Sequence, residues 1–419
     1  MMRLDADAVR AALLSHEEVA LVDVREQVPF AAGHILFAVH APLSRLEWTL
    51  PPLVPCRAAR LVLCDGGEGM AERAAEVALA MGYGNIAMLD GGTPAWRAAG
   101  FRLFTGLNAT GTALAETVDL ICSPPQMQPE ELARRRATGE AVVVLDSRPW
   151  EEYCDHHIPD GIACPGGELV YRAAALVPDA ETAVVVNCAG RSRSIFGAQS
   201  LINAGLPNPV YALAQGTYGW ARAGFELAQG PGPRADGVAG GEAPWARQAA
   251  RRVAEACGVR SIEAALLNRW CGEIDQRSLY LLDVRSPEEF AAGHVRGARN
   301  APGGQLVECA DDWIGVRGGR IVLLDDDGVR APMSASWLRQ LGYPDVAVLA
   351  DPLQASQVVG LPETSPSPPP PVRQAEMVTD PMAEAAAYLA WQSTLAQEVA
   401  EDGLLVFWPY RPDRDGVAP

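Results

Sequence analysis

The chain has 419 residues, of which 49% are hydrophobic, and its formal net charge is −18 at pH 7. This length exceeds what one hydrophobic core usually serves and predicts about two to four domains. The negative charge repels phosphate backbones and anionic membrane surfaces, so we expect neither nucleic acid nor a membrane as a partner.

Cysteine usage and the amino-terminal residues bear on the compartment. Nine cysteines are present, and no two of them have C-x-x-C spacing or cluster with histidines. This pattern argues against a disulfide framework and against zinc, so we expect free thiols, no metal and no cofactor. No apolar run approaches the ~20 residues of a membrane-spanning helix, and residues 1–15 are too charged for a secretory signal. We therefore expect a cytoplasmic protein.

One unit recurs three times along the chain. It begins with a short apolar strand that ends in Asp-x-Arg, found at 20–25, 145–148 and 282–285. A second apolar strand, a turn and a helix follow, and this strand lies at 60–63, 183–186 and 320–324. Asp23 precedes Asp146 by 123 residues, and Cys64 precedes Cys188 by 124. Nearly constant spacing indicates a tandem repeat of domains of about 100 residues.

Strands that alternate with helices predict the α/β class, with a mostly parallel sheet and helices on both faces in each domain. We place the three domains at 1–106, 123–228 and 245–358. Beyond a proline-rich spacer, residues 376–410 are predicted to form a helix with an apolar stripe and then a strand. Such a helix needs a surface to cover. It lacks the basic face that membranes select, so we expect it to dock on the protein's own domains rather than on a foreign partner.

The stretch with the clearest chemistry follows the apolar strand of the second unit. It reads Cys188-Ala189-Gly190-Arg191-Ser192-Arg193-Ser194 and is called the Cys188 loop below. Backbone N–H groups of the turn and the positive end of the following helix are expected to converge on the sulfur, and the two arginines add charge. We expect the pKa of the thiol to fall below its usual ~8.5, which favours the thiolate. The alternative is a buried structural cysteine beside two solvated arginines.

Four features together make all three units resemble rhodanese homology domains over roughly residues 15–355. They are the Asp-x-Arg strand ends, the Gly-His pairs at 33–34 and 293–294, the Cys188 loop, and the Gly-x-x-x-Trp segments at 92–96 and 216–220. In that family, the loop cysteine takes a sulfane sulfur from a donor such as thiosulfate, forms a persulfide and passes the sulfur to cyanide or a thiol.

The resemblance implies roles for particular residues. Cys188 would be the nucleophile and Arg193 the cation that holds the donor anion. Arg191 would be a second loop cation, and Arg148 would reach the donor site. The other members of the loop would line the substrate site, namely Ala189, Gly190, Ser192 and Ser194. The alternative for each arginine is a surface salt bridge.

The other two units depart from this pattern. The first keeps Cys64, which we align with Cys188, but has a glycine in the position of Arg193 and two added carboxylates. Like charges destabilise a thiolate, so Cys64 is expected to be a weak or silent second site. The third unit aligns Asp325 with Cys188 and keeps Arg330, and without a sulfur it is expected to be inactive.

Three functions remain open. The first is a sulfurtransferase that works through a Cys188 persulfide, with a small sulfur donor anion and a thiol or cyanide acceptor as its partners. The second is a persulfide carrier or sulfur-trafficking scaffold that serves an acceptor protein. The third is a cysteine-dependent phosphatase of the same fold. Loop length argues against the third, because those enzymes carry the arginine six positions after the cysteine and Arg193 is five after Cys188.

Overall fold

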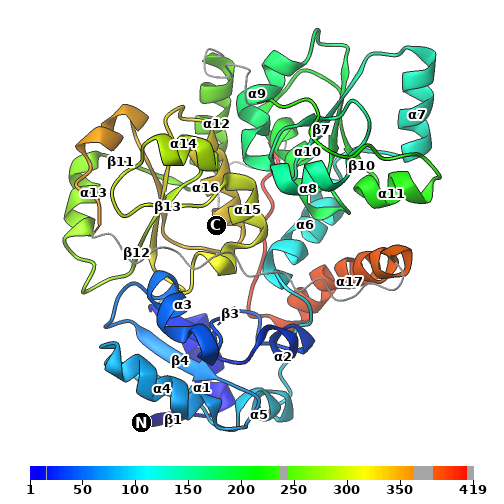
Figure 1. Ribbon diagram of the computed structural model, residues 1–419. Helices are drawn as coiled ribbons and strands as arrows, with labels where there is room; N and C mark the ends of the chain where they lie inside the picture. Colours follow the sequence, from blue (N-terminus) through cyan, green and yellow to red (C-terminus); the bar gives the residue numbers. More distant parts are fainter. Residues whose placement is uncertain (16, 236–243, 362–380, 413–419) are drawn as a thin grey trace.

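The computed structural model describes residues 1–15, 17–235, 244–361 and 381–412 (Figure 1). It contains three five-stranded sheets, and within each sheet every pair of neighbouring strands that is described runs parallel. The first sheet has the order β1-β5-β4-β2-β3, and its strands are β1 (Met2–Leu4), β2 (Val19–Asp23), β3 (Ala38–His40), β4 (Arg60–Cys64) and β5 (Ile86–Leu89).

The same order returns in the other two sheets. The second consists of β6 (Gln126–Met127), β7 (Val142–Asp146), β8 (Ile162–Ala163), β9 (Ala183–Asn187) and β10 (Val210–Leu213). The third consists of β11 (Arg260–Ile262), β12 (Leu279–Asp283), β13 (Arg299–Asn300), β14 (Arg320–Leu324) and β15 (Val346–Leu349). The predicted α/β class with three tandem domains is confirmed.

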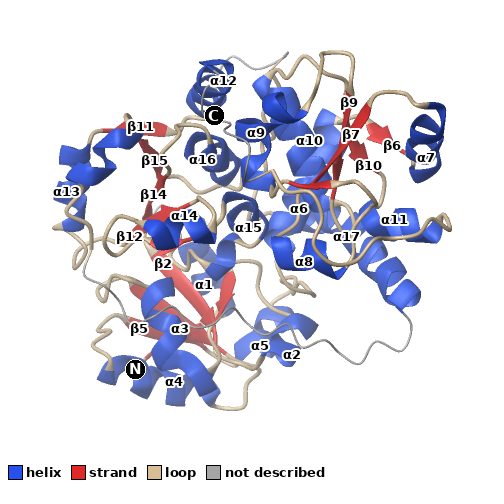
Figure 2. Cartoon of the chain, turned by 45° about the horizontal axis from the view of Figure 1, so that its top comes forward, coloured by secondary structure: helices blue, strands red, loops and turns tan. Residues whose placement is uncertain are grey.

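Helices cover the sheets on both faces (Figure 2). Those of the first domain are α1 (Ala6–Leu14), α2 (Gln27–Ala32), α3 (Leu46–Leu53), α4 (Met70–Ala80) and α5 (Gly92–Ala98). The second domain has α7 (Pro129–Thr138), α8 (Trp150–Asp155), α9 (Leu169–Leu176), α10 (Ser192–Ala204) and α11 (Gly216–Arg222). The third has α13 (Ala264–Cys271), α14 (Pro287–Ala292), α15 (Gly303–Glu308) and α16 (Arg330–Gln340). Short 3-10 turns add η1 (Leu43–Arg45), η2 (Gly166–Glu168), η3 (Ala310–Asp312) and η4 (Pro352–Gln357).

The central strands explain why the sequence folds this way. All residues of β2, β9 and β12 are buried, because helices on both faces exclude water from a parallel sheet. Their continuous apolar runs, such as Ala183 to Val186, are therefore the pattern expected for buried parallel strands.

Two further helices join the domains. Helix α6 (Ala109–Cys122) follows the first domain and packs against α10, and α12 (Pro244–Ala256) packs against α16 and α10. The second and third domains also meet directly. The rings of Phe196 and Trp337 pack edge to face at 5.0 Å, and Trp337 Nε1 donates to Ser200 Oγ at 2.8 Å.

The last helix, α17 (Pro381–Asp402), packs against α6 (Figure 1). The strand predicted after it is wrong for the described residues 403–412, none of which is in a strand. The neighbours Leu404 and Leu405 are both buried whereas Val406 is 79% exposed, so the segment lacks the alternation of a strand. This segment is held instead by side-chain packing and by a hydrogen bond that Tyr410 N donates to Gln340 Oε1 at 2.7 Å.

Candidate active site

The Cys188 loop leaves β9 at its carboxyl end and enters α10, which is where parallel sheets usually present ligand sites. The start of α11 supports it from one side. Thr217 N donates to Cys188 O at 2.8 Å, and Tyr218 N donates to Ala189 O at 3.0 Å. Gly216 permits this approach, because its φ is +55° and a Cβ built on it would lie 2.2 Å from Cys188 O. The backbone of the loop is thus tightly positioned.

The thiol of Cys188 lies inside the protein. The residue is 1% exposed, and its Sγ lies 3.5 Å from Ser194 Oγ, which itself donates to Arg191 O at 2.8 Å. Burial raises the pKa of the Cys188 thiol, while Arg193 and Ser194 lower it and Glu308 adds to the rise. The expected lowering of this pKa is therefore wrong for this structure. Loss of hydration outweighs the loop's positive charge.

Arg193 is paired with carboxylates from outside the loop. Its Nη1 and Nη2 lie 3.0 and 2.8 Å from the carboxylate oxygens of Glu152 on α8. Its Nε lies 3.5 Å from Glu308, the last residue of α15 in the third domain. Only 11% of the Arg193 side chain is exposed. The third domain therefore contributes a charge directly to this site.

Arg191 points to the other side, toward α6. Its guanidinium pairs with Glu116 at 3.2 Å and also with Asp119. Both loop arginines are thus matched by acids that lie far away in the sequence.

Arg148 is held at the end of its own strand. Its Nε and Nη2 each lie 2.8 Å from the carboxylate of Asp146, and Nη2 also donates to His156 O at 2.7 Å. Arg25 and Arg285 bind the aspartates of their own domains in the same way. An arrangement that recurs in all three domains indicates a structural pair, and the role of Arg148 in donor binding stays a prediction.

Strand register corrects the predicted equivalence of Cys64 and Cys188. The central strands pair their final residues as Asp23 with Cys64, Asp146 with Asn187, and Asp283 with Leu324. Cys64 thus corresponds to Asn187 and not to Cys188. A match by residue type misses this, because a shift of one residue turns a strand side chain to the opposite face of the sheet.

The residue of the first domain that occupies the place of Cys188 is Asp65. Thr93 N donates to Asp65 O at 2.8 Å, just as Thr217 N donates to Cys188 O. The same register puts Met70, not the glycine before it, in the position of Arg193. The first domain therefore has neither a cysteine nor an arginine at the positions equivalent to Cys188 and Arg193. Cys64 as a possible second site stays a prediction.

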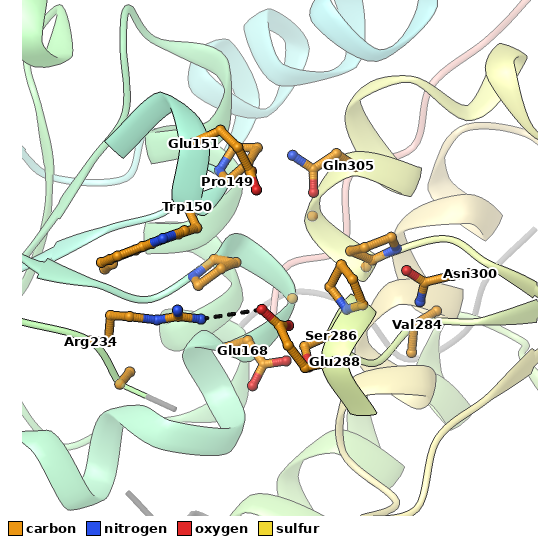
Figure 3. A pocket seen from close by; sticks show the side chains of 18 of the residues that line it. Pro149, Trp150, Glu151, Glu168, Arg234, Val284, Ser286, Glu288, Asn300 and Gln305 are labelled. Atoms are coloured by element: carbon orange, nitrogen blue, oxygen red, sulfur yellow. Dashed lines mark ion pairs between the residues drawn. The ribbon is translucent and has the colours of Figure 1, made fainter. Parts of the chain in front are cut away.

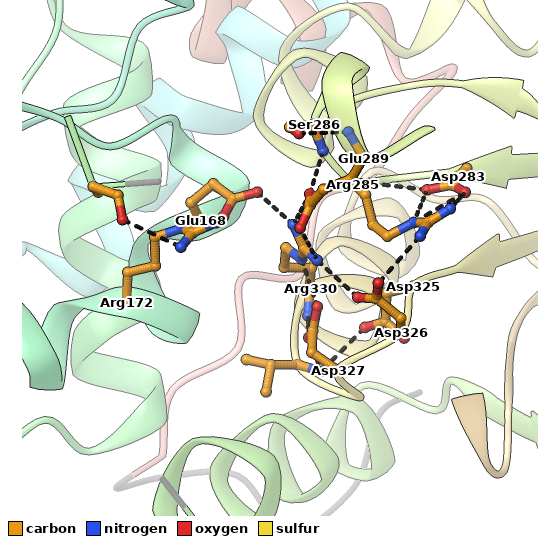
Figure 4. A network of polar contacts seen from close by, with 12 residues as sticks. Glu168, Arg172, Asp283, Arg285, Ser286, Glu289, Asp325, Asp326, Asp327 and Arg330 are labelled. Carbon is orange, nitrogen blue, oxygen red and sulfur yellow. Dashed lines mark hydrogen bonds and ion pairs between the residues drawn. The ribbon is translucent and has the colours of Figure 1, made fainter. Parts of the chain in front are cut away.

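In the third domain, a closed polar network replaces the sulfur site (Figure 4). Asp325 accepts hydrogen bonds from Val329 N at 3.1 Å and Ala331 N at 2.9 Å. Arg330 is fully buried and pairs with four carboxylates, namely Glu168, Glu289, Asp326 and Asp327. The position equivalent to Cys188 thus holds a carboxylate.

A cavity of about 680 Å³ lies between the second and third domains (Figure 3). Trp150 and Pro165 line it on one side and Glu288 and Gln305 on the other. None of the described residues that line it belongs to the Cys188 loop. A much smaller hollow is lined by Arg193 of the loop and shares Gly167, Gly303 and Gly304 with the cavity.

The described residues hold no group of three His, Cys, Asp or Glu side chains able to bind a metal ion. In those same ranges, no helix combines the length and apolarity needed to cross a membrane. No disulfide joins any of the nine cysteines.

Sequence reasoning missed several side chains that surround the loop, namely Glu116, Asp119, Glu152, Glu308 and Gln392. Glu152 carried a weak signal, because it lies one turn after the Asp-Ser-Arg strand end on a short helix. The others carried none, because each lies in an element whose packing against the loop no local pattern encodes.

Comparisons with known proteins agree with this architecture. The family model for the rhodanese-like domain matches residues 5–99, 128–223 and 263–355. The crystal structure of a thiosulfate sulfurtransferase from Pseudomonas aeruginosa is 44% identical, with a TM-score of 0.82, and the match covers 93% of this chain and 73% of that one. The HTH-type transcriptional regulator Rv0324 of Mycobacterium tuberculosis is 36% identical over 100 residues, which are 24% of this chain and 43% of that protein. The chain thus spans less than half the length of that curated relative.

Proposed function

The chain belongs to the rhodanese-like domain family, and from that premise we propose that it is a sulfurtransferase whose Cys188 carries the transferred sulfur. One observation carries the proposal. Three structurally equivalent loop positions hold Asp65, Cys188 and Asp325, so of these three positions only that of the second domain has a thiol to carry sulfur. The similar structure of a thiosulfate sulfurtransferase supports the same reaction class.

In the first half-reaction, the Cys188 thiolate attacks the outer sulfur of thiosulfate. A sulfur–sulfur bond forms at Cys188, the sulfur–sulfur bond of the donor breaks, and its electron pair leaves with sulfite. The product is a Cys188 persulfide. Arg193 and the amino end of α10 stabilise the negative charge of the donor.

In the second half-reaction, a nucleophile such as cyanide attacks the outer sulfur of the persulfide. The bond to Cys188 breaks, its electron pair returns to the Cys188 sulfur, and thiocyanate leaves. The cycle closes with no net oxidant or reductant.

The acids around Arg193 compete with the donor for its guanidinium. Glu152 and Glu308 occupy its guanidinium in this structure. A doubly charged donor therefore has to compete with these carboxylates. Its binding draws Arg193 away from them and places the cation next to the reacting sulfur atoms.

The test is intact-mass spectrometry after incubation with thiosulfate. We expect one added sulfur atom on the wild-type protein, its loss after addition of cyanide, and no addition to Cys188→Ser. Cys64→Ser is the matched control and should gain the sulfur as the wild type does. A sulfur that persists in Cys188→Ser would refute the assignment.

A further inference from the structure

Helix α17 lies against the Cys188 loop. A Cβ built on Gly190 would lie 3.6 Å from a side-chain atom of each of Tyr388, Leu389 and Gln392. These three residues are called the tail face. In Figure 1, the helix extends beside α6 and next to the second domain. It comes from the C-terminal part of the chain, far in sequence from the loop that it contacts.

Gln392 makes a direct polar contact between the helix and the loop. Its Nε2 donates to Ser192 Oγ at 2.8 Å, and the residue is only 1% exposed. Its Oε1 is buried and has no hydrogen-bond partner. A buried amide with an unused acceptor costs free energy unless a ligand or water satisfies it, which indicates that this side chain belongs to a binding site.

The helix is anchored on the first domain. Trp391 Nε1 donates to Thr105 O at 3.1 Å, and its ring lies so close to Gly106 that a Cβ there would be 2.4 Å away. Leu395 and Val399 are fully buried in the core of the same domain. The tail face is therefore held in place by the first domain, from which it reaches over the second.

Other elements contact the loop through its two arginines. Helix α6 lies on the side of Arg191, and α8 and α15 lie on the side of Arg193. With Cys188 only 1% exposed, access to its sulfur requires a local opening. The tail face contacts Gly190 without any ion pair among the described contacts, whereas ion pairs hold α6 against Arg191 and hold α8 and α15 against Arg193. We therefore expect the tail face to open more readily than the sides held by ion pairs.

We propose that the tail face forms the acceptor-side wall of the Cys188 site and determines the size of the acceptor. It admits a small nucleophile such as cyanide or sulfide and excludes a thiol carried on a folded protein. This inference rests on the proposed function and deepens it, since it selects between a small acceptor and a protein acceptor.

The first test measures access to Cys188 without any sulfur transfer. Leu389→Ala and Gln392→Ala are treated with iodoacetamide or with a bulky polyethylene-glycol maleimide, and modification of Cys188 is followed by peptide mass spectrometry. Because truncation of a packed side chain favours local opening, we expect the maleimide rate to rise roughly tenfold and the iodoacetamide rate to change less. Gln397→Ala, on the exposed side of the same helix, where the side chain donates to Glu401, should match the wild type.

The second test uses protein already loaded with sulfur. Discharge of the persulfide to cyanide is compared with discharge to reduced thioredoxin, which exposes a thiol on a folded surface. We expect wild-type protein to favour cyanide, and Leu389→Ala and Gln392→Ala each to shift the ratio toward thioredoxin.

The outcomes separate the two proposals. Equal maleimide rates in the wild type and both variants would overturn the wall, whatever the activity. Equal discharge of the wild-type persulfide to thioredoxin and to cyanide would also overturn it and would favour a persulfide carrier. Failure to form any persulfide would refute the proposed function, while the alkylation rates would still decide whether the tail face covers Cys188.

Discussion

Arg193 and Arg330 each reach across the contact between the second and third domains to a glutamate of the other. Arg193 Nε lies 3.5 Å from Glu308, and Arg330 Nη1 lies 2.8 Å from Glu168. Both arginines are the sixth residue after the end of their central strand. These two ion pairs connect the Cys188 loop of the second domain to the equivalent loop of the third domain, which has Asp325 instead of a cysteine. The third domain therefore acts on Cys188 through the negative charge of Glu308.

Glu308→Gln should make Cys188 more reactive at neutral pH. Burial raises the pKa of this thiol and Glu308 raises it further, so removal of the negative charge lowers it. We expect the midpoint of the pH profile for alkylation of Cys188 to move to lower pH, and the KM for thiosulfate to fall because Arg193 loses a competing carboxylate. Glu151→Gln is the control, because Glu151 is the exposed neighbour of Glu152 on α8, and this variant should leave the midpoint unchanged. An unchanged midpoint in Glu308→Gln would contradict this reading of the interdomain pair.

Arg193→Ala should reduce kcat/KM for thiosulfate about 10²–10³-fold, the cost of losing one donor that stabilises developing charge. The pKa of Cys188 should rise as well, because Arg193 lowers it in the wild type. Steady-state kinetics with thiosulfate and cyanide measure the first effect.

Arg191→Ala provides the comparison, because Glu116 and Asp119 of α6 hold that guanidinium. Its loss should mainly affect the free energy of unfolding. Equal kinetic losses in the two variants would show that both arginines bind the donor.

Cys64 should be among the last thiols to react in the folded protein. It is fully buried, and burial together with the charges of Asp23 and Asp65 raises its pKa well above the usual value. We expect iodoacetamide to modify the partly exposed Cys154 under native conditions and Cys64 only after unfolding. Peptide mapping over a time course measures this order. A persulfide detected on Cys64 would restore it as a second site.

Arg330→Ala should destabilise the protein by about 3–5 kcal/mol at pH 7, because buried carboxylates lose their partner. Burial acts to raise the pKa of Glu289, but hydrogen bonds from Arg330 lower it to about 2. A depressed carboxyl pKa contributes stability above its unfolded value of about 4.5, and that contribution disappears as the pH falls toward about 2. The difference in free energy of unfolding between Arg330→Ala and the wild type should therefore shrink as the pH falls from about 4.5 to about 2.

Denaturant unfolding at several pH values checks the expectation for Arg330. Arg134→Ala is a matched control, because its pairs with Glu131 and Glu140 are exposed and screened by solvent and should contribute little to the free energy of unfolding. A stability loss in Arg330→Ala as small as that of Arg134→Ala would mean that the buried network contributes little.

Local patterns in the sequence were enough to predict the three α/β units and the Cys188 loop. Buried parallel strands need continuous apolar runs, and turns between strand and helix are rich in residues such as glycine and serine, so both leave a signal within a few residues. Equal spacing then indicates the repeat. The one-residue error in the alignment of Cys64 could not be detected from the sequence. Strands that are buried on both faces have no alternation of apolar and polar residues, and without it the sequence does not fix the exact position of a cysteine at the strand end.

The electrostatic state of the site was decided only by the tertiary structure. The sequence shows two arginines and no acid inside the Cys188 loop, whereas packing brings Glu116, Glu152 and Glu308 to them from three separate elements. Packing also places Gln392 against Ser192 of the Cys188 loop, 200 residues away in the chain. The sequence by itself determined the fold and singled out Cys188 as the candidate nucleophile, because those depend on local periodicity and on a residue type. The charge and accessibility of the sulfur depend on contacts between distant segments, and these exist only once the domains have packed.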